Sequence, residues 1–166
     1  MFRSFVRTPP DFTPMLMRVA LGVVMFPHGA QKVLGWFGGP GLAASLQGFA
    51  RLGIPTPLAW LDLLAEFVGS ILLVVGLFGR VAAFGIACVM CVAIALVHLP
   101  NGFFMNWQGK QAGEGIEYHI LALALAIGVI VRGSGLWSLD RLWWKNGYHH
   151  HVETPRATTD EPRHAA

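Results

Sequence analysis

Two pairs of ionisable residues stand at helical spacing inside apolar stretches of the sequence. His28 and Lys32 are four residues apart, and so are Asp62 and Glu66. Residues four apart project from one face of an α-helix, so each pair presents both side chains on the same side. If the two faces oppose each other, carboxylates meet cationic groups, which is chemistry suited to binding a polar group or moving protons. Ionisable groups in apolar helices are costly, so each one requires a partner or a function.

Four apolar windows are long enough to position these residues within a membrane. A hydrocarbon core of ~30 Å is spanned by about 20 helical residues. We predict spans at about 14–34, 57–78, 81–99 and 115–133. The third has no polar face from Val81 to Val97, as a soluble bundle helix would have, and no window shows the alternation of a barrel strand. The predicted fold class is therefore all-α, an integral membrane bundle of four transmembrane helices.

Composition agrees with a membrane location. The 166 residues are 54% hydrophobic and 13% charged, whereas soluble domains carry roughly 25% charged residues. The net charge is +3, but the twelve Lys and Arg residues are spread singly and form no basic run. We therefore expect the lipid bilayer as a partner and no nucleic acid. Residues 1–145 are predicted to form the transmembrane domain, and the polar residues 146–166 a disordered cytoplasmic tail.

Basic residues near the predicted helix ends indicate the orientation. One side collects Arg3, Arg7, Arg80, Arg132, Arg141 and Lys145, and the other Lys32, Arg51 and Lys110. The positive-inside rule then places both termini in the cytoplasm. The connection Gly35–Thr56 is expected to contain a short helix on the outer interface, and the connection rich in aromatic residues after His98 is expected to fold over the outer mouth.

This orientation places most of the ionisable groups at similar depth. His28 and Glu66 fall ~10–14 Å below the outer interface by helical rise, with Lys32 and Asp62 one turn further out. His98, Glu117 and His119 lie at the outer ends of the third and fourth helices. We predict a substrate or proton-relay pocket from these residues, and the alternative is that the ion pairs only hold the helices in register.

Arg18 lies near the inner end of the first helix, far from this cluster. The favoured interpretation is a lipid-facing charge that snorkels to inner phosphates. The alternative is a structural charge paired with Asp140 or with carbonyl groups near Arg80. Arg80 is likewise interpreted as structural or lipid-facing.

Several stretches, taken in order, resemble the DoxX family between Met15 and Asp140. They are RVALGVVMFPHGAQK, AEFVGSILLVVGLFGR, HLPNGFFMNW, GEGIEYH and GSGLWSLD. The resemblance implies a four-helix bacterial inner-membrane protein, in a family named for a subunit linked to a terminal quinol oxidase. Relatives include the membrane subunit of a thiosulfate:quinone oxidoreductase and a member of an oxidoreductase complex that handles thiol stress. The family's recurrent positions correspond to Arg18, His28, Gly29, Lys32, Glu66, Gly69, Gly76, Arg80, His98, Glu117 and Tyr118. The resemblance thus adds Tyr118 to the predicted pocket.

Two functions of different classes remain open. The first is a membrane subunit associated with an oxidoreductase, which binds a quinone or a small sulfur- or thiol-derived substrate in the outer-half pocket. The sequence has no haem, flavin or iron–sulfur motif, so the chain would need a redox partner protein. The second is a non-enzymatic scaffold or small-solute carrier, which would require a homo-oligomer because four helices are few for a transporter. No metal site and no catalytic residue are assigned.

Overall fold

The computed structural model describes residues 8–143, and all regular secondary structure in this range is helical. The predicted tail, 146–166, and the predicted domain boundary at residue 145 lie outside the described residues.

Three of the predicted spans correspond to long helical stretches, two of which change their helix type along the way. The elements are α2 (Phe12–Leu34), α3 (Gly41–Arg51), α4 (Thr56–Leu63), the π-helical segment η2 (Leu64–Val68), α5 (Gly69–Val75), α6 (Gly79–Ala93), the π-helical segment η3 (Ile94–His98) and α7 (Glu117–Arg132). Short 3₁₀ turns, η1 (Trp36–Gly38) and η4 (Leu99–Asn101), follow α2 and η3. The fourth span is α7, which is shorter, at 16 residues.

The helix ends follow from local chemistry. The Asp11 carboxylate accepts a hydrogen bond from the Thr13 N–H at the start of α2, and Gly35 ends the helix with a φ of 71°. Gly76 has the same φ of 71° and ends α5 at Val75, three residues before the predicted end of that span at residue 78. Glycine at these two positions adopts the left-handed conformation without the steric cost of a Cβ.

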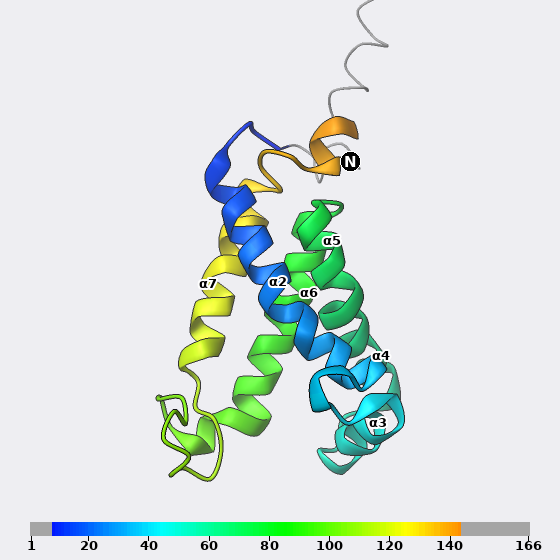
Figure 1. Ribbon diagram of the computed structural model, residues 1–166, viewed down its shortest axis with the longest axis vertical. Helices are drawn as coiled ribbons and strands as arrows, with labels where there is room; N and C mark the ends of the chain where they lie inside the picture. The colour runs from blue at the N-terminus through cyan, green and yellow to red at the C-terminus, as the bar shows by residue number, and fades with distance from the viewer. Residues whose placement is uncertain (1–7, 144–166) are drawn as a thin grey trace, which may run out of the picture.

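The long helices run antiparallel, so the connections gather at two opposite ends (Figure 1). One end holds residues 8–11, the turn 76–78 and residues 133–143, and we call it the terminal end. The other end holds α3 and the connection 102–116, and we call it the loop end. The predicted short helix between the first two spans is confirmed as α3.

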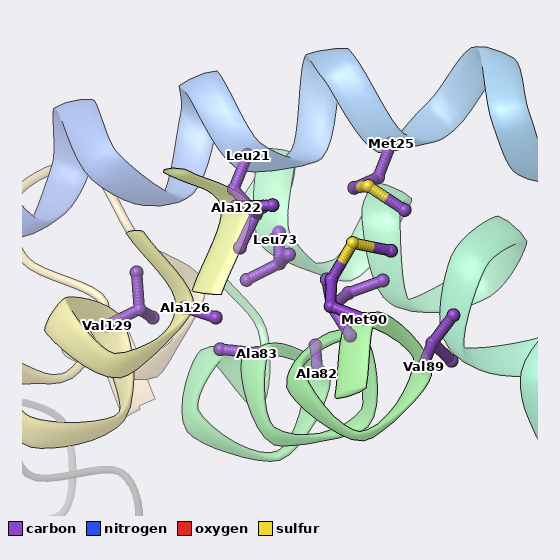
Figure 2. Packing of buried hydrophobic residues seen from close by; sticks show 11 residues of the cluster. Leu21, Met25, Leu73, Ala82, Ala83, Val89, Met90, Ala122, Ala126 and Val129 are labelled. Atoms are coloured by element: carbon purple, nitrogen blue, oxygen red, sulfur yellow. The ribbon is translucent and has the colours of Figure 1, made fainter. Parts of the chain in front are cut away.

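Small residues allow the helices to approach closely around an apolar core. A Cβ on Gly22 would lie 2.7 Å from the Ser70 carbonyl oxygen, and one on Gly29 would lie 2.6 Å from the Phe67 backbone. Close backbone approach of this kind is typical of helix packing in lipid. Figure 2 shows the core side chains converging from α2, α5, α6 and α7. The core residues shown are Leu21, Met25, Leu73, Ala82, Ala83, Ile86, Val89, Met90, Ala122, Ala126 and Val129.

The outward faces of the helices are also apolar. Large hydrophobic side chains such as Phe84, Leu121 and Val131 are more than half exposed. Two helices, Thr56–Val75 and Gly79–Asn101, are long and apolar enough to cross a membrane by length and composition. Extended apolar surface of this kind is unusual for a soluble monomer and is expected where lipid is the solvent.

Candidate functional site

Three charged side chains join α2 to the helix formed by α4 and η2, near the loop end. The Lys32 ammonium lies 2.6 Å from Oε2 of Glu66 and 3.0 Å from Oδ2 of Asp62. Glu66 is buried, with 3% of its surface exposed, while the side chains of Lys32 and Asp62 keep 29% and 17%. We call these three residues the triad. The contact between Glu66 and Lys32 is the one that helical spacing predicts.

Helix α3 packs over the loop-end side of the triad. The Phe49 ring centroid lies 5.4 Å from the Lys32 ammonium, which is within the range of a cation–π contact. The Ser45 hydroxyl donates a hydrogen bond of 3.1 Å to the Lys32 carbonyl oxygen. The predicted short helix therefore holds Lys32 in place, because it contacts both the ammonium and the backbone of that residue.

Two of the predicted site residues belong to π-helical segments. Glu66 lies in η2, where the Gly69 N–H bonds the Leu64 carbonyl, and His98 lies at the end of η3. A π-helical segment accommodates an extra residue in a helix and reorients the side chains around it, and such segments are frequent at functional sites. The simple i,i+4 pattern did not predict either segment.

A row of aromatic and imidazole rings extends from the triad toward the connection 102–116. The His28 and Tyr118 ring centroids are 5.8 Å apart, those of Tyr118 and His119 are 5.4 Å apart, and those of His119 and His98 are 4.0 Å apart. The Tyr118 hydroxyl donates to the Met25 sulfur at 3.2 Å. The structure therefore brings together residues from α2, η3 and α7 that the sequence placed in one pocket.

Glu117, another predicted site residue, contacts the backbone of the connection 102–116 and not the triad. Its Oε2 accepts a hydrogen bond of 3.2 Å from the Met105 N–H, and Glu114 accepts one of 2.6 Å from the Asn106 N–H. Glu117 thus fastens the connection 102–116 to the start of α7, whereas Glu114 closes a contact within that connection. A chemical role for Glu117 stays a prediction, and its contact indicates a structural one.

The charge of the triad determines what it can do. One ammonium faces two carboxylates, so with all three groups ionised the triad carries a net negative charge at a partly buried position. Uncompensated charge in a low-dielectric interior is strongly unfavourable. A proton, a cation or a ligand that donates hydrogen bonds would balance it. The triad is therefore suited to exchanging a proton or binding a donor group.

The terminal end holds a second polar group of residues, centred on Arg18. Arg18 is buried, with 1% of its surface exposed, and the interpretation of a lipid-facing, snorkelling charge is wrong. Its five N–H groups donate to the carbonyl oxygens of Leu73, Val74, Ser134, Leu136 and Trp137 at 2.8, 2.6, 2.7, 3.0 and 2.7 Å. A guanidinium has five N–H donors, so every one is used. The carbonyl contacts agree with a structural role for Arg18, although the carbonyls belong to residues 73–74 and 134–137 and were not the ones predicted near Arg80.

Asp140 completes this network on the side of α6. Its carboxylate accepts from the N–H groups of Phe78 and Gly79 at 2.8 and 3.0 Å and from the Ser134 hydroxyl at 2.6 Å. These contacts stabilise the N-terminus of α6, where a negative charge is favourable. We call Arg18, Ser134 and Asp140 the terminal-end network. Arg80 takes a structural role nearby, because its guanidinium donates to the Ile130 carbonyl oxygen.

Sequence reasoning missed Ser134 as a member of this network, and the direct contact between the His98 and His119 rings. A signal for Ser134 existed in the stretch GSGLWSLD, which surrounds Asp140 with small and turn-forming residues. Within residues 8–143, no three His, Cys, Asp or Glu side chains gather in a way that could hold a metal ion.

An all-helical chain with an apolar outer surface and charged groups in its interior is typical of a helical membrane protein, and the comparisons agree with a membrane protein. The DoxX family model matches residues 13–99, more than half of the chain, so the protein belongs to the DoxX family of membrane proteins.

Two relatives extend the match beyond residue 99. The "Uncharacterized membrane protein Rv3486" of Mycobacterium tuberculosis (strain ATCC 25618 / H37Rv) is 35% identical over 144 residues, which cover 80% of this chain and 81% of that protein. The "Putative oxidoreductase CatD" of Bacillus subtilis (strain 168) is 28% identical over 131 residues, which cover 79% of this chain and 87% of that protein. No solved structure matches the chain.

Proposed function

We propose that this protein is a multi-pass subunit of an oxidoreductase in the bacterial inner membrane. The triad with His28 and Tyr118 binds the polar head of a quinone or a small sulfur- or thiol-derived substrate. Both ends of the chain face the cytoplasm, so the loop end lies in the outer half of the bilayer. The name of the Bacillus subtilis relative supports an oxidoreductase connection.

One observation carries the proposal: the triad lies near His28 and Tyr118, two further side chains that can donate or accept a proton. Reduction of a quinone to the quinol adds two electrons and two protons, and the protons end on the two ring oxygens. Such chemistry needs an apolar slot with proton donors at the oxygens. Lys32, Glu66 and Tyr118 present ammonium, carboxyl and phenol groups in one region, and Met25 offers an apolar wall beside Tyr118.

Aromatic residues at both ends support the placement in the bilayer. At the loop end Trp36, Phe37 and Trp107 are more than half exposed, and at the terminal end so are Trp137 and Trp143. Tryptophan is enriched at both membrane–water interfaces. The exposed apolar side chains between the two ends then face the acyl chains.

The electrons must come from a partner in this proposal, because the sequence contains no haem, flavin or iron–sulfur motif. Purification in mild detergent followed by native mass spectrometry is expected to retain a redox protein or a quinone. Recovery of a non-redox complex, or of a homo-oligomer with a small solute, would favour the alternative of a scaffold or carrier.

Quinone binding is tested directly with the purified protein in nanodiscs and a short-chain quinone. We expect Glu66→Gln to weaken binding at least tenfold, because the amide keeps the shape and removes the ionisable group. Asp11→Asn is the matched control, since Asp11 is also an ion-paired carboxylate but lies at the terminal end, 3.3 Å from Arg132. Equal quinone affinity in the two variants would reject the triad as the binding site.

Orientation is tested by labelling single cysteines in a background with Cys88 and Cys91 replaced by serine. A cysteine at Gln47, in α3, is expected to react with an impermeant thiol reagent in intact cells. A cysteine at Thr158 is expected to react only after the cells are opened. Reaction of both positions in intact cells would contradict the proposed topology.

A further inference from the structure

We propose that His98, His119, Tyr118 and His28 form a proton path between the aqueous surface of the loop end and the buried carboxyl group of Glu66. The inference rests on the proposed function only for the placement of the loop end at the outer membrane surface. It names the route by which the triad is protonated, whichever substrate the triad binds.

The outer end of the path is His98, whose tautomer follows from its contact. Its Nδ1 lies 2.8 Å from the Glu114 carbonyl oxygen. A carbonyl only accepts hydrogen bonds, so Nδ1 carries the hydrogen and Nε2 is left with a lone pair in the neutral ring. A proton arriving from water binds Nε2. His98 is partly exposed, and Glu114 lies on the exposed connection 102–116.

His119 is the next group, and it is the most unusual one. It is buried, with 5% of its surface exposed, and its Nδ1 makes no hydrogen bond of ordinary geometry among the described residues. Its ring centroid lies 4.0 Å from that of His98, so the two rings are in contact. The Gly115 backbone also interacts with this ring, so one nitrogen of the neutral imidazole has a partner and the other keeps a lone pair. A neutral imidazole lone pair in contact with the His98 ring can receive a proton from it.

Tyr118 and His28 cover the remaining distance to the triad. The Tyr118 ring centroid lies 5.4 Å from that of His119 and 5.8 Å from that of His28, so the three rings form a continuous row. The Tyr118 hydroxyl and the Glu66 carboxylate are close enough to interact electrostatically, as are His28 and Lys32. Each group takes up one proton and releases one, so its net protonation is unchanged, and the ring tautomers and the hydroxyl orientation reset before the next transfer.

The two terminal residues of the path share a backbone feature. His98 and Glu66 both lie in π-helical segments, η3 and η2, on two different helices. A regular α-helix would direct each side chain differently, and π-helical segments are frequent at functional sites.

The groups that face Glu66 set its charge before a proton arrives. They are Lys32 on α2, Asp62 on α4 and Tyr118 on α7, and His28 interacts in turn with Lys32. Lys32 favours the carboxylate, whereas Asp62 disfavours a second negative charge and so favours proton uptake. One proton on Glu66 makes the triad neutral. The triad is therefore a store for a single proton.

The experiment follows protonation of Glu66 itself and uses no substrate, so its outcome is independent of quinone binding. In nanodiscs, the infrared C=O band of the protonated carboxyl group is assigned as the band that Glu66→Gln removes. After a jump to lower pH, we expect His98→Gln and His119→Gln to slow the appearance of this band at least tenfold. Added imidazole should restore part of the rate.

Lys110→Gln serves as the control, because it removes an exposed charge from the same connection without touching the ring row. It is expected to keep the parental rate. His98→Gln keeps the test informative if His119→Gln fails to fold, because His98 lies nearer the surface. Parental rates in both histidine variants, or a Glu66 band that does not change between pH 5 and pH 9, would overturn the proposal.

Discussion

The two polar regions of this bundle contain similar residues, but they differ in how completely the charged and hydrogen-bonding groups have partners. In the terminal-end network, all five Arg18 donors have carbonyl partners, and Asp140 accepts three hydrogen bonds. At the loop end, one ammonium serves two carboxylates, and a buried imidazole nitrogen has no well-formed hydrogen bond. Saturated groups cannot take part in chemistry without breaking the fold, whereas under-saturated groups can accept a proton or a ligand.

We infer from this difference that the terminal end has a structural role and the loop end a chemical one. The terminal-end network joins α2, the end of α5, the start of α6 and the residues after α7. The triad joins only two helices, and α3 covers it. Variants at the terminal end should therefore affect stability, and variants at the loop end should affect binding and proton transfer more than stability.

Arg18→Leu should have the largest effect on stability. It leaves five backbone carbonyl groups without their donor and removes a buried charge that its surroundings compensate. We expect the free energy of unfolding to fall by about 4 kcal/mol or more, since hydrogen bonds to charged groups contribute about 1.5–3 kcal/mol each and are not additive. Unfolding by SDS titration measures it. A loss below about 1 kcal/mol would remove the distinction between the two ends.

Lys32→Met should lower the free energy of unfolding by less than Arg18→Leu does, and a second substitution should reverse most of that loss. The single variant leaves Glu66 buried without its cation, but Glu66 can bind a proton instead. We therefore expect a loss of about 2 kcal/mol, less than the ~3–5 kcal/mol of a fully buried pair. The double variant Lys32→Met/Glu66→Gln should recover most of that loss in the same titration. No recovery would mean that Lys32 stabilises the fold through contacts other than Glu66.

Asp140→Asn should lower stability by about 1–2 kcal/mol through the start of α6, which is the range for losing a capping side chain. The amide nitrogen cannot accept the Gly79 N–H, whereas Oδ1 can still accept the Phe78 N–H. Thermal unfolding in detergent should show the loss, and quinone binding at the loop end should not change. A change in quinone binding would couple the two ends and weaken the comparison.

Asp62→Asn should have the smallest effect on stability, below about 1 kcal/mol, because a partly exposed ion pair contributes little. Its effect on the triad's charge is larger. Removing one carboxylate leaves Lys32 and Glu66 as a neutral pair, so the variant should bind a proton less readily. The infrared band of protonated Glu66 should then appear at lower pH than in the parent. An unchanged midpoint would show that Asp62 does not influence Glu66.

Local periodicity was sufficient to predict the charged faces of the first two helices. The spacing of His28 with Lys32 and of Asp62 with Glu66 predicted one cluster, and the close contact of Lys32 with Glu66 agrees. The helix ends were also predictable to within a few residues, because glycine and proline act on their own backbone. The four spans, predicted from the length of the apolar windows, and the orientation of the chain ends, predicted from the charge pattern, stay predictions.

The sequence by itself determined the all-helical class and the residues that face one another across α2 and its neighbour. Only the tertiary structure decided the role of Arg18, because its carbonyl partners lie 55 to 119 residues away and belong to backbone that no side-chain pattern describes. The tertiary structure also decided that Glu66 and His98 lie in π-helical segments, and that His98 contacts His119. Helical periodicity fixes the direction of a side chain within its own helix, but the packing of separate helices sets which side chains meet.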